Sequence, residues 1–287
     1  TPEDIQLIQN DTKTCPDTGM AGASRSLYMD GNATIIAANK LLAAMRKEDG
    51  TLRTYDEMKA EGIETKYLGR YETNTTPGLC RLDPNTGIGD PTPAFTYCLN
   101  LAEVEVDTKT GKTTVLKFTC VDFVGRIGNI DAVNGQAYSG IMHGIGFALK
   151  EDYADVKKHA NMFGAGTSYI KDVPDDINLI HIDGAISDGP FGSSGASEAF
   201  QASGHCAVLN GIYNACGVRI HEIPALPEKV KAGLDAIAKG EKPYEPKKYF
   251  LGSDMYEELE NIKENPVQVG TQSFYVSLDD PTAERPF

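Results

Sequence analysis

The sequence lacks the cysteine pattern of a metal or iron–sulfur site and has few basic residues. Its six cysteines form no Cys-x-x-Cys pair and have no histidine neighbours at zinc spacing. Lys and Arg total 27 against 41 Asp and Glu, which gives a formal net charge of -14. Nucleic acids and anionic membranes need a basic surface, so neither is expected as a partner. Without a secretory signal, we expect mostly buried thiols and a reduced, cytoplasmic compartment.

The 287 residues are 40% hydrophobic, enough to bury a large core in one large domain or two ordinary ones. The first residue is not Met, and residues 5–9 are interpreted as the start of a strand. Such a strand needs neighbours to pair with. We therefore expect a preceding segment, on another chain or removed by cleavage.

Strand and helix patterns alternate irregularly along the chain, which predicts an α+β fold with mixed sheets and packed helices. The most distinct pattern is a hairpin, with strands at 94–106 and 113–124 around a turn at 107–112. Helices are predicted at 32–46, 55–60, 129–149, 199–216 and 227–238, and strands at 178–182 and 218–220. These elements define a domain over residues 1–240. Residues 241–287, with a short helix at 255–262, are predicted to be an extended tail on a partner surface or a disordered one.

The predicted helix at 129–149 contains glycines at 135, 140, 144 and 146. Each costs a helix about 1 kcal/mol relative to alanine, so they suggest close packing against another backbone. Gln136 has an amide suited to the edge of a heterocycle, although a helical glutamine commonly faces solvent. His143 is interpreted as a packed histidine and not as a ligand.

A glycine-rich loop at 188–198 leads into the predicted helix at 199–216. Glycines at 189, 192 and 195 allow a backbone to approach a ligand closely, because no Cβ blocks it. Glu198 then stands at the helix entrance, a suitable place for a general base. The alternative is an ordinary helix start with an acid near the positive end of the dipole.

A second loop of small and hydroxyl residues, at 14–26, precedes the first predicted helix. Its hydroxyls, free amides and Arg25 could bind a phosphate or pyrophosphate at the helix entrance. It is not a Walker loop, because no Gly-Lys-Ser/Thr follows. A capped loop without a ligand is the alternative.

Three separated signatures together resemble the molybdenum hydroxylase family, which includes xanthine dehydrogenases and aldehyde oxidoreductases. They lie at residues 14–26, 134–146 and 192–198, and residues 210–220 and 226–230 also resemble the end of this family's sequences. The resemblance covers most of residues 1–240. It implies that the chain is the second half of the molybdopterin-binding catalytic region.

The resemblance implies a molybdopterin dinucleotide carrying molybdenum, or tungsten, held by the pterin's dithiolene sulfurs without a protein metal ligand. Pyrophosphate binding is implied for Gly22, Ala23, Ser24, Arg25 and Ser26, with Ala23 reaching toward the metal's ligands. Gln136 would bind the pterin edge, and Ser194, Gly195, Ala196 and Ser197 would pass beside the metal. Glu198 matches the catalytic glutamate, which accepts a proton from the metal-bound hydroxyl as that oxygen attacks the substrate carbon.

The residues around Glu198 depart from the xanthine type, which has Gly before the glutamate and Pro-Pro-Leu after it. Here Ser197 precedes it, and Ala199, Phe200 and Gln201 follow. We therefore expect an enzyme that oxidises aldehydes to carboxylic acids and resembles the bacterial aldehyde oxidoreductases. A purine or N-heterocycle hydroxylase, acting on xanthine or nicotinate, is the alternative, and a non-catalytic cofactor-binding module is a rival of another class.

The resemblance also implies partners. A chain or segment would carry the first half of the catalytic region, and an iron–sulfur subunit or domain would receive the electrons, with a flavin subunit as an optional further partner. The cysteine spacing of this chain offers no iron–sulfur site of its own.

Overall fold

The computed structural model describes residues 2–9, 11–19, 21–73, 92, 94–155, 157–242 and 264. The chain divides into two compact units, Thr1–Tyr244 and Glu245–Phe287. The predicted helix at 255–262 lies outside the described residues, and the boundary at residue 240 stays a prediction. Within the described ranges, no helix is long and apolar enough to cross a membrane.

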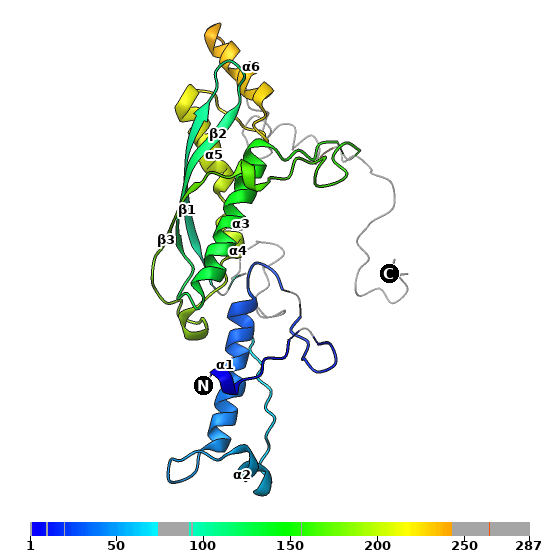
Figure 1. The fold of residues 1–287 in the computed structure, drawn as a ribbon, viewed down its shortest axis with the longest axis vertical. Coiled ribbons are helices and arrows are strands. Elements are labelled where there is room, and N and C mark those ends of the chain that lie inside the picture. Colours follow the sequence, from blue (N-terminus) through cyan, green and yellow to red (C-terminus); the bar gives the residue numbers. More distant parts are fainter. Residues whose placement is uncertain are drawn as a thin grey trace. The chain divides into compact units, whose positions relative to one another are not determined.

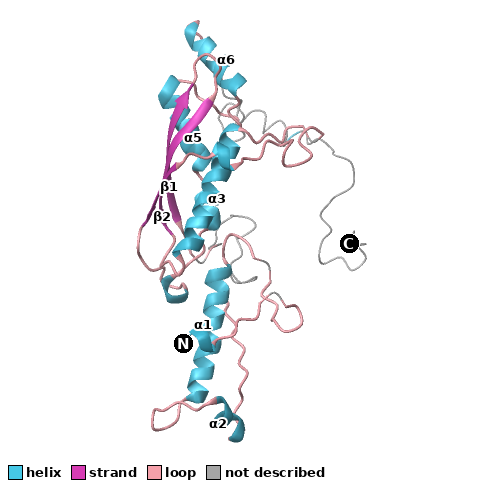
Figure 2. Ribbon diagram, viewed as in Figure 1, coloured by secondary structure: helices cyan, strands magenta, loops and turns pink. Residues whose placement is uncertain are grey.

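A mixed three-stranded sheet with the order β1-β2-β3 organises the described part of the first unit (Figure 2). Strands β1 (Tyr97–Val106) and β2 (Thr113–Phe123) are antiparallel, which confirms the predicted hairpin. Strand β3 (Asp176–His181) pairs with β2 in parallel. Because parallel strands need a crossover connection, the chain between β2 and β3 must return along the sheet.

Helix α3 (Ile130–Leu149) lies in this crossover and confirms the predicted helix at 129–149. It begins where the Asn129 side chain accepts the Ala132 N–H over 3.0 Å, a typical N-cap. Helices α3 and α5 lie along one face of the sheet (Figure 1). The core between them is apolar and fully buried; its members include Phe118, Cys120, Ala137, Ile141, Ile145 and Val208.

The predicted helix at 199–216 is wrong as one continuous element. The structure has α4 (Ser197–Gln201) and α5 (Gly204–Cys216), with a non-helical Ser203 between them at φ -125° and ψ 2°. The apolar period continues through the break, so periodicity alone could not show it. Helix α5 ends at Gly217, which adopts the left-handed conformation common for a glycine at a helix end.

The glycines of α3 allow the helices to touch. A Cβ at Gly140 would lie 2.5 Å from the Phe200 Cβ, and one at Gly144 would lie 2.9 Å from the Gly204 Cα. A Cβ at Gly146 would meet the Glu151 carboxylate. The predicted close packing against another backbone is therefore confirmed at Gly140 and Gly144, whereas Gly146 meets side chains. The prediction is wrong at Gly135, where a Cβ would meet nothing within 4 Å.

The remaining elements largely follow the predicted pattern. Helix α1 (Ser26–Met45) begins earlier than the predicted residue 32, and α2 (Tyr55–Ala60) carries a capping box between Thr54 and Glu57. Helix α6 (Pro227–Ala238) is where it was predicted. Short 3-10 turns η1, η2 and η3 span Pro2–Asp4, Ile170–Asp172 and Pro190–Gly192.

Two predicted strands are wrong. Residues 5–9 are irregular and pair with no strand of the described chain, and their apolar side chains are exposed. Residues 218–220 form no strand, although Val218 and Ile220 are buried in a second core cluster with Val230 of α6. Their apolar character reflects this packing and not sheet pairing. The expectation of mostly buried thiols is also wrong for the described cysteines, of which Cys120 alone is buried.

Candidate functional site

The structure brings the two predicted ligand loops, residues 22–26 and 194–198, into direct contact. The backbone N–H of Glu198 donates to the Ser24 Oγ over 3.2 Å. At Gly195 a Cβ would overlap the Ser24 carbonyl group, so this approach is possible only for glycine. A second link lies nearby, where the Asn32 Nδ2 donates to the Asp188 carbonyl oxygen over 2.8 Å. The loops therefore form one site.

Strained backbone is concentrated in these loops. Three non-glycine residues of the described chain have positive φ: Ala23 at 50°, Ser24 at 57° and Phe191 at 53°. Such conformations cost on the order of 1–3 kcal/mol each and persist where the surroundings enforce them. Ala23 and Ser24 lie in the first loop, and Phe191 lies just before the second. This distribution marks the loop pair as a candidate functional site.

The amino end of α1 is suited to an anion. This 20-residue helix begins at Ser26, with no side-chain cap hydrogen bond from Arg25 and no acidic residue in its first turn. The first N–H groups of a helix carry partial positive charge and need an acceptor. Arg25 and Ser26 are exposed beside them. These groups fit a phosphate or pyrophosphate.

Glu198 lies in the first turn of α4, as predicted, and its side chain is exposed on this chain. The helix is anchored by Phe200, which is fully buried and touches Gly140 of α3. Phe200 is thus a core residue that fixes the backbone beneath Glu198.

The glycine-rich loop is also tied to the carboxyl ends of β2 and β3. The Arg126 N–H donates to the Gly192 carbonyl oxygen over 2.8 Å, and Gly125 forms an isolated bridge with Ser193. Parallel strands end at the same edge of a sheet, so this edge, the start of α3 and the loop lie together.

Gln136 is exposed on the amino-terminal half of α3. Within the described chain its side chain makes no hydrogen bond to either loop. His143 is also exposed, and its ring makes an edge contact with Phe147 at 6.1 Å, which agrees with a packing role.

One polar chain at this edge was missed by sequence reasoning. The Asp122 Oδ2 lies 2.7 Å from the His181 Nδ1, and the His181 Nε2 lies 2.8 Å from the Asn134 Oδ1. Burial raises the pKa of the Asp122 carboxyl, while the hydrogen bond from His181 acts in the opposite direction. The available signal was a polar residue near the carboxyl end of each of two predicted strands.

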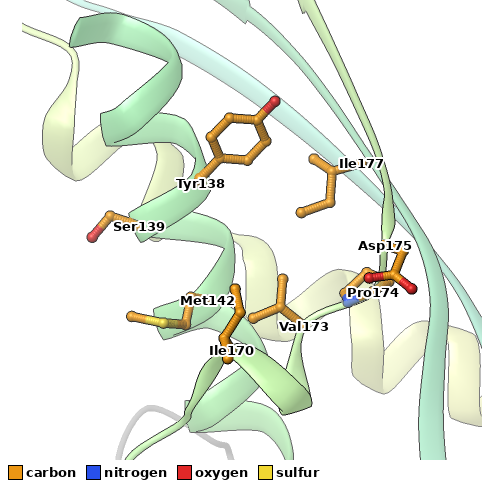
Figure 3. A pocket seen from close by; sticks show the side chains of 8 residues that line it. All are labelled: Tyr138, Ser139, Met142, Ile170, Val173, Pro174, Asp175 and Ile177. Carbon is orange, nitrogen blue, oxygen red and sulfur yellow. The ribbon is translucent and has the colours of Figure 1, made fainter. Parts of the chain in front are cut away.

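A separate open pocket of about 450 Å³ lies between α3, η2 and the start of β3 (Figure 3). The Tyr138 ring from α3 points toward Ile177 of β3. The pocket is lined by Tyr138, Ser139, Met142, Ile170, Val173, Pro174, Asp175 and Ile177. The site residues predicted from the sequence do not line it. Among the described residues, no group of three or more His, Cys, Asp or Glu side chains could hold a metal ion.

Comparison with known proteins decides the family. Residues 1–174 match the family model described as a molybdopterin cofactor-binding domain. The chain belongs to this family. It is 43% identical to an aldehyde oxidoreductase of Megalodesulfovibrio gigas over 235 residues, which cover 82% of the chain and 26% of that protein. These matches confirm the resemblance to the molybdenum hydroxylase family.

A solved structure and a more distant relative agree with this assignment. The aldehyde oxidoreductase from Desulfovibrio desulfuricans has a TM-score of 0.76 and 45% identity, covering 80% of this chain and 25% of that one. A probable hypoxanthine oxidase of Escherichia coli is 28% identical, covering 82% of this chain and 26% of that protein. The chain therefore spans about a quarter of the length of these relatives.

Proposed function

We propose that the chain forms the second half of the molybdopterin-binding catalytic region of an aldehyde oxidoreductase. The observation that carries this proposal is the contact between the strained loop at 22–26 and the loop that ends at Glu198. The contact places a potential general base beside a potential anion site. Identity with the Megalodesulfovibrio gigas aldehyde oxidoreductase supports the proposal at family level.

The residues present fit a pterin dinucleotide. The amino end of α1, with Arg25 and Ser26, supplies donors for its pyrophosphate, and the remaining loop residues Gly22, Ala23 and Ser24 complete this surface. Gln136 offers an exposed amide for the pterin edge. Residues 194–197 pass beside the reacting centre. When bound, the molybdenum cofactor would supply the oxygen transfer and the two-electron redox chemistry.

Glu198 acts as the general base in this proposal. Oxidation of an aldehyde with water yields a carboxylic acid, two protons and two electrons, and the Glu198 carboxylate accepts one of these protons. A base must be within hydrogen-bond reach of the proton it removes, and its backbone anchor on Ser24 holds it at the cofactor loop. On this chain alone the carboxylate is exposed. Segments outside the chain must therefore exclude water from it.

Such segments are also needed to cover an apolar sheet face. Tyr97, Leu99 and Leu101 alternate along β1, and their side chains are 64%, 64% and 57% exposed. A contiguous exposed apolar surface usually marks an interface. We assign this face to the first half of the catalytic region. An iron–sulfur domain or subunit, with a flavin subunit in some assemblies, would receive the electrons.

The most specific part of the proposal is the substrate class. Small aldehydes are favoured because identity with the aldehyde oxidoreductase is 43%, against 28% with the hypoxanthine oxidase. The test is a panel of aldehydes, purines and nicotinate, assayed on the purified enzyme that contains this chain with an artificial electron acceptor. The highest kcat/KM should belong to an aldehyde. A higher value for xanthine or nicotinate than for every aldehyde would establish the heterocycle alternative.

A further inference from the structure

Asp122, His181 and Asn134 form a continuous polar chain across three elements. Asp122 lies on β2, His181 ends β3, and Asn134 lies on α3, with contacts of 2.7 and 2.8 Å between them. The Asp122 side chain is fully buried, and that of His181 is 15% exposed. The contacts therefore fix Asn134 to the carboxyl ends of two parallel strands.

A buried carboxylate is expensive to maintain, so this arrangement requires an explanation. Within the described chain the second oxygen of Asp122, Oδ1, has no hydrogen-bond partner. An apolar residue at position 122 would avoid that cost and still fill the core. The polar chain is thus poorly explained by stability alone.

The position of this polar chain in the fold indicates its role. His181 is the last residue of β3, from which the chain continues to the glycine-rich loop. Asn134 stands two residues before Gln136 on the same helix. Hydrogen bonds have preferred distances and directions, so the contact with His181 restricts how α3 can rotate or shift at Asn134. The polar chain therefore sets where α3 places Gln136 relative to the loop.

We propose that Asp122 and His181 are positioning residues that act through Asn134 to hold the start of α3, and with it Gln136, against the cofactor. This inference rests on the proposed function, in which Gln136 binds the pterin edge. In metal sites, partners that orient a ligand typically change affinity by roughly 10–100-fold when removed. A comparable effect is expected here on cofactor retention.

The test uses the purified holoenzyme that contains this chain, with the variants His181→Ala and Asn134→Ala. His159→Ala is a matched control, since the His159 side chain is also 15% exposed and lies 3.8 Å from a carboxylate oxygen of Asp152. Loss of molybdenum and pterin nucleotide during dialysis is followed over time, together with the melting temperature of the cofactor-free protein. Both test variants should lose cofactor at least about tenfold faster than wild type. The control should not.

The double variant His181→Ala with Gln136→Ala separates positioning from a direct role, because a polar chain that acts through Gln136 has no further effect once that amide is removed. The double variant is expected to lose cofactor at about the rate of the Gln136→Ala single variant. The inference is overturned if the double variant loses cofactor markedly faster than Gln136→Ala, if His159→Ala matches His181→Ala, or if no variant changes retention. Should His181→Ala fail to fold, Asn134→Ala, alone and combined with Gln136→Ala, decides. A wild-type enzyme without molybdenum or pterin would instead refute the proposed function itself.

Discussion

The backbone N–H of Glu198 donates to the Ser24 Oγ over 3.2 Å, although the two residues are 174 positions apart in the sequence. This hydrogen bond joins the first turn of α4 to a loop held at positive φ. The base and the anion site are thereby kept in one fixed relationship. The predictions below test the parts of this relationship separately.

Replacing Glu198 by Gln should lower kcat by roughly a hundredfold or more, because the amide keeps the shape but cannot accept a proton. Molybdenum content should remain at the wild-type level. Steady-state kinetics with an aldehyde, together with metal analysis, measure both quantities. Glu48→Gln, at an exposed glutamate in the turn that follows α1, is the control and should leave kcat unchanged. A near-normal kcat in metal-loaded Glu198→Gln would favour the non-catalytic cofactor-binding module.

Replacing Gly195 by Val should separate the two loops, because the added carbons would overlap the Ser24 carbonyl group. We expect lower cofactor content and lower activity, measured on purified enzyme. Gly128→Ala is the control, since a Cβ there meets nothing within 4 Å. Equal cofactor content and activity in both variants would show that the loop contact is not required.

Replacing Gln136 or Arg25 by Ala should reduce the amount of dinucleotide that copurifies with the enzyme. Each substitution removes a donor for the ligand and leaves the proposed base in place. The amount of bound dinucleotide is measured by releasing the nucleotide with acid and quantifying it by chromatography. Full occupancy in both variants would remove these residues from the proposed site.

Replacing Gly140 by Ala should lower the free energy of unfolding by roughly 1–3 kcal/mol, as expected for overpacking. The added Cβ would lie 2.5 Å from the Phe200 Cβ and 2.8 Å from the Phe200 carbonyl carbon. Gly135→Ala, on the same helix, faces open space and should raise that free energy by up to about 1 kcal/mol through helix propensity. Urea denaturation followed by circular dichroism compares the two. The opposite order would contradict the packing of α4 on α3.

Elements with strong local signals could be predicted from the sequence. The hairpin follows from alternation on both sides of a turn, and α3 follows from helical spacing with Asn129 as its cap. The break at Ser203 was not predicted from local spacing, and Gly204 directly after it lies against Gly144 of another helix. Residues 5–9 show the same limit, because local strand propensity cannot supply a partner strand.

The site was predictable in its parts but not in its assembly. Glu198 at a helix entrance and a hydroxyl-rich loop before α1 are local features. The contact of Ser24 with Gly195, and the chain from Asp122 to Asn134, join distant segments whose meeting depends on the whole fold. The burial of Phe200 against α3 likewise depends on segments that only the complete fold brings together.

The most direct test of the central claim is elemental and nucleotide analysis of the purified, monodisperse protein that contains this chain, with the copurifying chains identified. The loops at 22–26 and 194–198 should hold a pterin dinucleotide, so molybdenum or tungsten should be present in equimolar amount with a released nucleotide. A well-folded preparation with neither the metal nor the nucleotide would contradict the account.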